Sequence, residues 1–208
     1  MSDSVTTNPR EVEEQPHPCD PSAGCRFSIY PMTDAYVPVI VDALAQTPSD
    51  GLEVVTDDVS TYLAGEPAAM LSFVAQTIVA VSRRTGHVAA TLLLSRGCPG
   101  EGPCRPAAPA SFTRATRAAS IEPAGIRAAA HFSLYPLGVP GYMEIIGSEI
   151  ELAKEAGLYA RAEHFTSRLE GDLAQVLSAI GDSWGRADAS HVVAHATISV
   201  GSATREQP

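Results

Sequence analysis

The chain has 208 residues, and its 24 acidic residues against 14 Lys and Arg give a formal net charge of -10. This length suits one two-lobed globule or two small domains of about a hundred residues each. The acidic balance would repel a polyanion, so we expect no nucleic-acid partner. Apolar runs stay well short of the roughly 20 residues that a membrane-spanning helix needs, and acids and prolines fill the N-terminus where a signal peptide is apolar. We therefore expect a cytoplasmic protein without direct membrane insertion.

Changes in composition divide the chain into five segments. Residues 1–24 are polar, acidic and rich in proline, which predicts a flexible N-terminal tail. Residues 98–128 combine prolines, glycines and alanines, which is typical of a connector. The sequence thus predicts domains at 25–97 and 129–201, followed by a C-terminal tail at 202–208.

The first domain shows a regular succession of predicted elements. Residues 26–32 alternate between apolar and polar, as in a half-buried strand, and Asp34 can cap a helix with apolar residues at helical spacing. A hairpin of strands 52–56 and 59–63 turns on two acids. A second helix then begins with proline in its first turn and leads to a strand at 87–95.

The second domain repeats the first. FSIYP at 27–31 returns as FSLYP at 132–136, and two further blocks recur in the same order: Gly51-Leu52 as Gly157-Leu158, and His87-Val88 as His191-Val192. Such ordered recurrence indicates a duplicated domain. The predicted elements are strand 131–137, helix 141–156, strands 158–162 and 165–170, helix 172–184 and strand 191–200.

The order strand, helix, strand, strand, helix, strand in each copy predicts an α+β fold. Such a βαββαβ unit forms a ferredoxin-like sandwich, with an antiparallel sheet covered by helices on one face. We predict two of these domains in tandem.

The four cysteines predict neither disulfides nor a metal site. They are few for a disulfide scaffold, and a cytoplasm would keep them reduced. No CxxC pair or zinc-type spacing is present. We expect all four to be structurally indifferent: Cys19, Cys25, Cys98 and Cys104.

The first strand of each copy carries a Ser-x-Tyr pattern on the face away from the core. The residues are Ser28 with Tyr30, and Ser133 with Tyr135. A face with hydroxyls and aromatic rings suits a small polar ligand or a wet dimer interface. Ordinary alternation of a solvent-facing strand explains the pattern equally well.

The hairpins give a second candidate site. Each places a carboxylate before paired hydroxyls, a set that can bind an exocyclic amine, a ring nitrogen or a cation. The alternative is structural, because acids are common in turns and hydroxyls in strands. The candidates are Asp57, Asp58, Ser60 and Thr61 in the first copy, and Glu163, His164, Thr166 and Ser167 in the second.

The sequence contains no recognisable catalytic signature. It lacks a GxSxG elbow, an HExxH pair, a Walker loop and a GxGxxG turn. His191 and His195 share a strand face, but four residues of strand separate them by about 13 Å, too far for one metal ion. We expect neither enzymatic activity nor a bound metal.

Three of these motifs resemble one known family. CRFSIYPM with the downstream Tyr36, the TDDVST hairpin and HFSLYPLG together resemble the YkoF family of thiamine- and hydroxymethylpyrimidine-binding proteins. The resemblance implies a non-enzymatic cytoplasmic homodimer that binds thiamine or its pyrimidine precursor in each domain, without a cofactor. It also implies a role in salvage or transport of the precursor, with a transporter as a conceivable partner.

Under this resemblance, each predicted site combines a tyrosine with one hairpin. Tyr30 joins the first hairpin and Tyr135 joins the second. Because Asp57-Asp58 becomes Glu163-His164 in the second copy, we expect unequal affinities, with the first site tighter. Two alternatives remain open, namely an enzyme acting on a thiamine precursor and a dimerisation or regulatory module without a small-molecule ligand.

Overall fold

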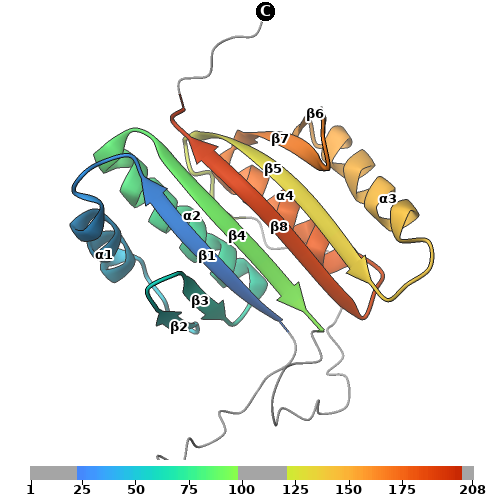
Figure 1. Cartoon of the computed structure of the whole chain (residues 1–208), viewed down its shortest axis with the longest axis horizontal. Helices are drawn as coiled ribbons and strands as arrows, with labels where there is room; N and C mark the ends of the chain where they lie inside the picture. Colours follow the sequence, from blue (N-terminus) through green and yellow to red (C-terminus); the bar gives the residue numbers. More distant parts are fainter. Residues whose placement is uncertain (1–22, 98–120, 203–208) are drawn as a thin grey trace, which may run out of the picture.

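A computed structural model describes residues 23–97 and 121–202. They form one eight-stranded antiparallel sheet in the order β2-β3-β1-β4-β8-β5-β7-β6, with the helices together on one face (Figure 1). The elements of the first repeat are β1 (Ala23–Pro31), α1 (Tyr36–Gln46), β2 (Glu53–Thr56), β3 (Thr61–Ala64), α2 (Pro67–Thr85) and β4 (Val88–Arg96). Those of the second are β5 (Arg127–Leu137), α3 (Tyr142–Glu155), β6 (Tyr159–Glu163), β7 (Thr166–Asp172), α4 (Leu173–Arg186) and β8 (His191–Val200).

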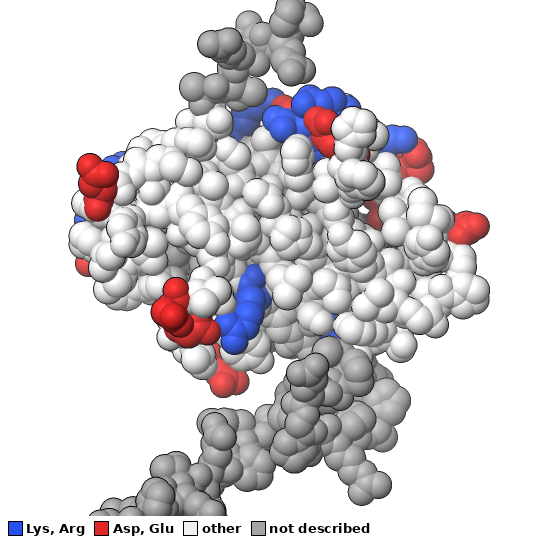
Figure 2. Space-filling view, viewed as in Figure 1, with Lys and Arg blue, Asp and Glu red and all other residues white. Residues whose placement is uncertain are grey.

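The observed order confirms the predicted tandem of ferredoxin-like βαββαβ units. In β1, Phe27 and Ile29 are buried, whereas Arg26 and Tyr30 on the other face are accessible. This alternation places one side of the strand against the helices and leaves the other open. Figure 2 looks onto the open face, which is mostly uncharged in its middle and carries charged groups near its rim.

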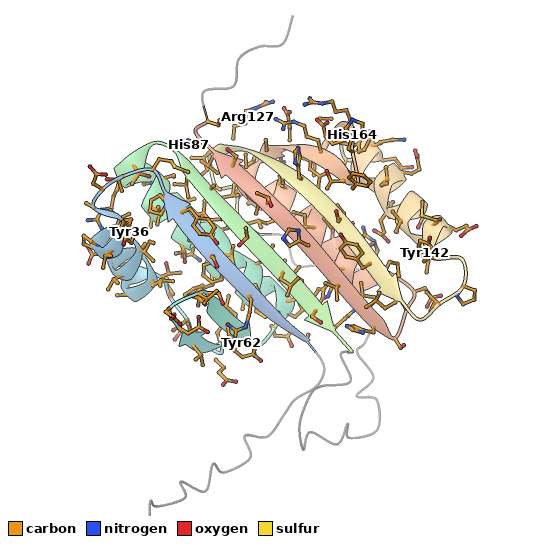
Figure 3. All side chains as sticks on the ribbon, viewed as in Figure 1. Tyr36, Tyr62, His87, Arg127, Tyr142 and His164 are labelled. Atoms are coloured by element: carbon orange, nitrogen blue, oxygen red, sulfur yellow. The ribbon has the colours of Figure 1, made fainter. Side chains whose placement is uncertain are left out.

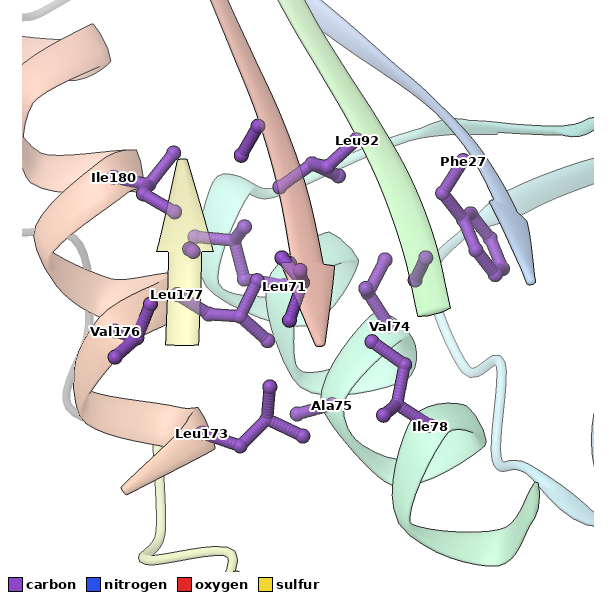
Figure 4. Packing of buried hydrophobic residues seen from close by; sticks show 14 of the residues in the cluster. Phe27, Leu71, Val74, Ala75, Ile78, Leu92, Leu173, Val176, Leu177 and Ile180 are labelled. Carbon is purple, nitrogen blue, oxygen red and sulfur yellow. The ribbon is translucent and has the colours of Figure 1, made fainter. Parts of the chain in front are cut away.

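The two repeats join edge to edge and share one core. Their last strands, β4 and β8, pair along their length, from Val88 opposite Val200 to Arg96 opposite Val192. Behind them α2 and α4 contact each other, and side chains such as Leu71 and Leu177 belong to the same buried cluster (Figure 4). The two repeats therefore share one continuous sheet and one hydrophobic core.

Two glycines allow the central strands to pass close to the neighbouring loops. Gly97 follows β4 and Gly201 follows β8, both at positive φ, +69° and +68°. A Cβ atom would lie 1.8 Å from the carbonyl oxygen of Ser190 in the first case and of Gly86 in the second. Only glycine fits both positions, which explains why this residue recurs in the two copies.

A buried arginine from the first repeat closes the end of the last helix in the second. The guanidinium of Arg96 donates to the carbonyl oxygens of Trp184, Ala187 and Ala189 at 3.0, 2.5 and 3.0 Å. Carbonyls at a helix C-terminus lack partners within the helix and carry partial negative charge, so a cation suits this position. Arg96 thus binds the two repeats together.

The second repeat begins slightly before the position expected from sequence. Strand β5 starts at Arg127, whereas the predicted domain starts at 129. The residues just before β5 are held by Asp172, which accepts hydrogen bonds from the backbone N–H groups of Ala124 and Gly125 at 3.0 and 2.7 Å. Asp172 is also the N-cap of α4, where it accepts from the backbone N–H of Ala174. The rest of the predicted connector and most of both predicted tails lie outside the described residues.

Cys25 is buried in the core, where burial raises the pKa of its thiol. It therefore packs as a small apolar side chain. Cys19, Cys98 and Cys104 lie outside the described residues.

Candidate functional site

Each hairpin covers only part of the strand beside it. Strand β3 pairs with β1 only from Cys25 to Phe27, and β7 pairs with β5 only as far as Phe132. Within the described residues, the second half of each of these strands therefore has a free edge between the hairpin tip and the first helix of its repeat. Such an edge exposes backbone donors and acceptors to a ligand.

In the second repeat this gap is a cavity of about 880 Å³. The edge of β5, helix α3 and the β6–β7 hairpin enclose it. Its apolar wall includes Leu134 from β5 with Ile146 and Ile150 from α3. The volume and the largely apolar lining are typical of a small-molecule site. We refer to this cavity as the second-repeat slot.

Among the polar groups that interrupt the apolar lining of the slot are Glu149, Glu163 and Thr166. Glu149 on α3 is only 6% exposed, and its carboxylate accepts a hydrogen bond of 2.7 Å from the guanidinium of Arg186. Glu163 pairs with Arg161 at 2.7 Å. The hydroxyl oxygen of Thr166 is buried and has no hydrogen-bond partner in the part of the chain that the structure describes. An unsatisfied buried hydroxyl costs free energy, so a ligand that bonds to it would recover that cost.

Aromatic side chains surround the mouth of the slot. Tyr135 and Tyr142 are about half exposed, and Figure 3 labels Tyr142 beside the start of α3. Phe165, at the tip of the hairpin, is 99% exposed and has a φ of +67°. A left-handed backbone and a bare aromatic ring are both costly for phenylalanine. Residues held at such a cost are concentrated at functional sites.

The first repeat has the same construction. Ser28 donates its hydroxyl to the carbonyl of Val59 at 2.9 Å, and Ser133 makes the matching contact to Phe165 at 3.4 Å. These bonds fold each hairpin tip against the open-face side of its neighbouring strand. Tyr36 lies at the start of α1 as Tyr142 lies at the start of α3 (Figure 3).

The two hairpins differ in how their acids are used. In the first, Asp57 accepts from the backbone N–H groups of Val59 and Ser60, both at 2.8 Å, and its other oxygen pairs with Arg26 at 3.0 Å. These partners, the backbone groups of Ser60 and Val59 foremost, lower the pKa of Asp57 from 3.8 to about 2. One carboxylate oxygen of Asp57 therefore serves the turn, and the other binds the hairpin to Arg26 of β1.

This arrangement predicts acid sensitivity of the first hairpin. Because the folded pKa of Asp57 lies below its unfolded value, the stabilisation is present above about pH 4 and is lost as the pH falls through 2. We expect the amide NMR shifts of Val59 and Ser60 to titrate with a midpoint near 2, and the titration to vanish in Asp57→Asn. A midpoint near 4 would contradict the observed hydrogen bonds.

The structure brings together most of the second predicted set. Tyr135, Glu163, Thr166 and Ser167 all line the second-repeat slot, whereas His164 is not among its lining residues and its neighbour Phe165 is.

In the first predicted set, the residues have different environments. Tyr30 is half exposed on the open face, and Asp58 is exposed at the hairpin tip. Ser60 accepts a hydrogen bond from Arg26 at 2.7 Å. Thr61 is buried, with its hydroxyl 3.0 Å from that of Thr56. Three side chains of this set, those of Asp57, Ser60 and Thr61, thus already make contacts with Arg26 or with other hairpin residues.

Sequence reasoning missed Glu149, although a signal was present. Glu149 lies three residues after Ile146 in α3, on the stripe that packs towards the sheet, and its counterpart in the first repeat is the buried Ala43. A carboxylate on an apolar stripe departs from amphipathic patterning and indicates a buried ion pair or a site. Here it is both, because Glu149 pairs with Arg186 and lines the slot.

The fold and the slot define a tandem ferredoxin-like protein with a largely apolar cavity at the outer edge of its second repeat. Residues 22–101 and 127–205 both match the YkoF-related family, so the chain belongs to that family. It is also similar to a protein of Bacillus subtilis (strain 168) that carries the name "Putative HMP/thiamine-binding protein YkoF". The two are 29% identical over 194 residues, which span 91% of this chain and 96% of the relative.

Within residues 23–97 and 121–202, none of the helices has both the length and the apolar character needed to cross a membrane.

Proposed function

We propose that the second-repeat slot binds thiamine or its hydroxymethylpyrimidine precursor reversibly, with no bond made or broken. The observation that carries this proposal is the buried hydroxyl of Thr166, which lines the slot and has no hydrogen-bond partner within residues 23–97 and 121–202. The aminopyrimidine ring offers a donor and acceptors along one edge, which a hydroxyl and a carboxylate can satisfy. The name of the Bacillus relative supports the same ligand class.

The charge and shape of the slot suit a cationic heteroaromatic compound. Two carboxylates, those of Glu149 and Glu163, lie among its lining residues. Thiamine carries a thiazolium cation, which carboxylates attract and which can also lie over an aromatic face. Tyr142 and Phe165 at the mouth can supply such faces.

The geometry favours the second site over the first, which reverses the order of affinities expected from sequence. The acids of the first hairpin led to that expectation, but both oxygens of Asp57 have partners within the protein, whereas Glu149 and Glu163 each use one oxygen in an ion pair among the described residues. The second repeat adds the buried carboxylate of Glu149, where the first has Ala43. We therefore propose that the second slot is the tighter site.

Thr166→Val tests the proposal with a near-isosteric change. Removal of an unsatisfied buried hydroxyl should leave the melting temperature unchanged or slightly higher, because its desolvation cost disappears. The affinity for thiamine or hydroxymethylpyrimidine should fall about tenfold, the equivalent of roughly 1.4 kcal/mol, because one ligand hydrogen bond is lost. Isothermal titration calorimetry measures both affinities.

The matched control for this experiment is Thr91→Val. Thr91 lies in the middle of β4, away from the slot, and the change removes the same hydroxyl. This variant should bind as the unmodified protein does. Equal affinity of Thr166→Val and Thr91→Val would contradict the proposed role of Thr166.

We further propose that the protein is a homodimer that holds its ligand for salvage or for transfer to a transporter. The hydroxyl-bearing open face of the sheet supports self-association, because its middle is mostly uncharged (Figure 2). Sedimentation analysis with and without ligand measures the oligomeric state. A ligand recovered chemically unchanged after incubation supports binding without catalysis.

A further inference from the structure

A row of basic side chains crosses the open face at the outer edge of the second repeat. Arg161 on β6 lies directly opposite Arg168 on β7, which lies directly opposite His131 on β5. Residues opposed in this way have Cβ atoms about 4.5–5.5 Å apart and project from the same face. We call these three residues the basic row.

Such a row is unfavourable by itself, because like charges directly opposite each other destabilise a sheet. The first repeat avoids it. The equivalent positions on β2, β3 and β1 are Val55, Tyr62 and Arg26, so this row has a single cation. That cation lies 5.8 Å from the ring centre of Tyr62 and pairs with Asp57. The accumulation of basic groups is therefore particular to the second repeat.

The basic row lines an open cavity of about 1150 Å³. Thr197 and Ser199 on β8 add hydroxyls to it, and Arg127 and Arg83 add a third and a fourth guanidinium. Arg127 and Arg168 share one carboxylate, that of Glu170, while Arg161 pairs with Glu163. Two carboxylates thus serve three guanidiniums, which leaves positive charge in a protein whose net charge is -10.

We propose that the basic row binds a phosphate group, either as inorganic phosphate or as part of a phosphate ester. Guanidinium groups offer paired N–H donors that match the oxygens of phosphate. The imidazole of His131 and the hydroxyl of Thr197 supply further donors on the same row. A dianion relieves the repulsion along the row more than a single carboxylate would.

The phosphate site is adjacent to the second-repeat slot. Arg161 lines the cavity of the basic row, Glu163 lines the slot, and the two side chains form an ion pair. The bound phosphate can therefore be a free ion or the phosphoryl group of a phosphorylated slot ligand. The second possibility rests on the function proposed above, and the first does not.

Titration with inorganic phosphate at constant ionic strength tests the site itself. Phosphate should raise the melting temperature above that in sodium chloride of equal ionic strength, and Arg161→Gln should weaken phosphate binding at least tenfold. The matched control is Arg84→Gln, which removes one cation from α2, where Arg84 pairs with Asp42 and is not among the residues that line the cavity. Equal phosphate affinities of the two variants, or no stabilisation beyond that of chloride, would overturn the proposal.

A second titration distinguishes the two sources of phosphate. If the phosphoryl group belongs to the slot ligand, thiamine monophosphate binds more tightly than thiamine, and Arg168→Gln, which leaves the Arg161–Glu163 pair of the slot in place, removes only this difference. If free phosphate is the ligand, saturation with thiamine leaves the phosphate affinity unchanged. If the unmodified protein did not bind thiamine at all, the slot proposal would be wrong. The inorganic phosphate titration would still show whether the basic row binds phosphate.

Discussion

Replacement of Arg96 by methionine should lower the free energy of unfolding by about 3–5 kcal/mol. The change leaves three carbonyl oxygens at the end of α4 without the donor that reaches them from β4. A buried acceptor that loses its partner costs about 1–3 kcal/mol, while the carbonyl oxygen of Ala187 keeps the N–H of Ala189 at 2.9 Å. Methionine keeps much of the side-chain volume, so the loss reports mainly on the hydrogen bonds.

Urea denaturation monitored by tryptophan fluorescence measures this loss. Trp184 is the sole tryptophan in the sequence, is fully buried, and supplies one of the three carbonyls. Arg84→Met is the control, because its exposed ion pair with Asp42 should contribute less than about 1 kcal/mol. An Arg96→Met protein as stable as this control would mean that Arg96 does not bind the repeats together.

Replacement of Glu149 by leucine should lower the free energy of unfolding by about 2–3 kcal/mol and weaken thiamine binding more than tenfold. The destabilisation follows because Arg186, whose side chain is 27% exposed, loses its partner at 2.7 Å. The expected loss of stability is smaller than for a fully buried ion pair, because Arg186 still pairs with Asp182 at 3.4 Å. The loss of binding follows because a carboxylate disappears from the slot.

A double variant separates these two effects of Glu149. Glu149→Leu combined with Arg186→Met replaces the ion pair by apolar side chains, which should restore stability to within about 1 kcal/mol of the unmodified protein. Thiamine affinity should remain low, because the carboxylate is still absent. Chemical denaturation and calorimetry on the same samples provide both values. If the double variant bound thiamine normally, Glu149 would have no part in the site.

Local patterns in the sequence were sufficient for the secondary structure and the repeat. The alternation around Phe27 and Ile29 predicted β1, and proline at the start of α2 with glycine at its end bounded that helix. These signals depend on a few neighbouring residues, so they can be recognised in the sequence before the tertiary structure is known. The matching segments at 27–31 and 132–136 revealed the duplication in the same way.

The candidate site was predicted in part, because only some of its residues belong to a local sequence pattern. Thr166 and Glu163 were found from the hairpin pattern, and both line the slot. Phe165 was not predicted as a site residue, because its left-handed backbone and its full exposure are properties of the folded hairpin. Asp57 was predicted to bind a ligand, and the structure places its carboxylate in contact with Arg26 and two backbone amides, which the sequence pattern does not reveal.

By itself, the sequence determined the two βαββαβ units, their duplicated hairpins and the family to which the motifs point. The tertiary structure alone decided that β4 pairs with β8, that Glu149 lies in the slot, and that Arg161, Arg168 and His131 form one row. The reason is physical: periodicity records which face of its own element a residue occupies, whereas these contacts depend on strand register and helix packing between distant segments.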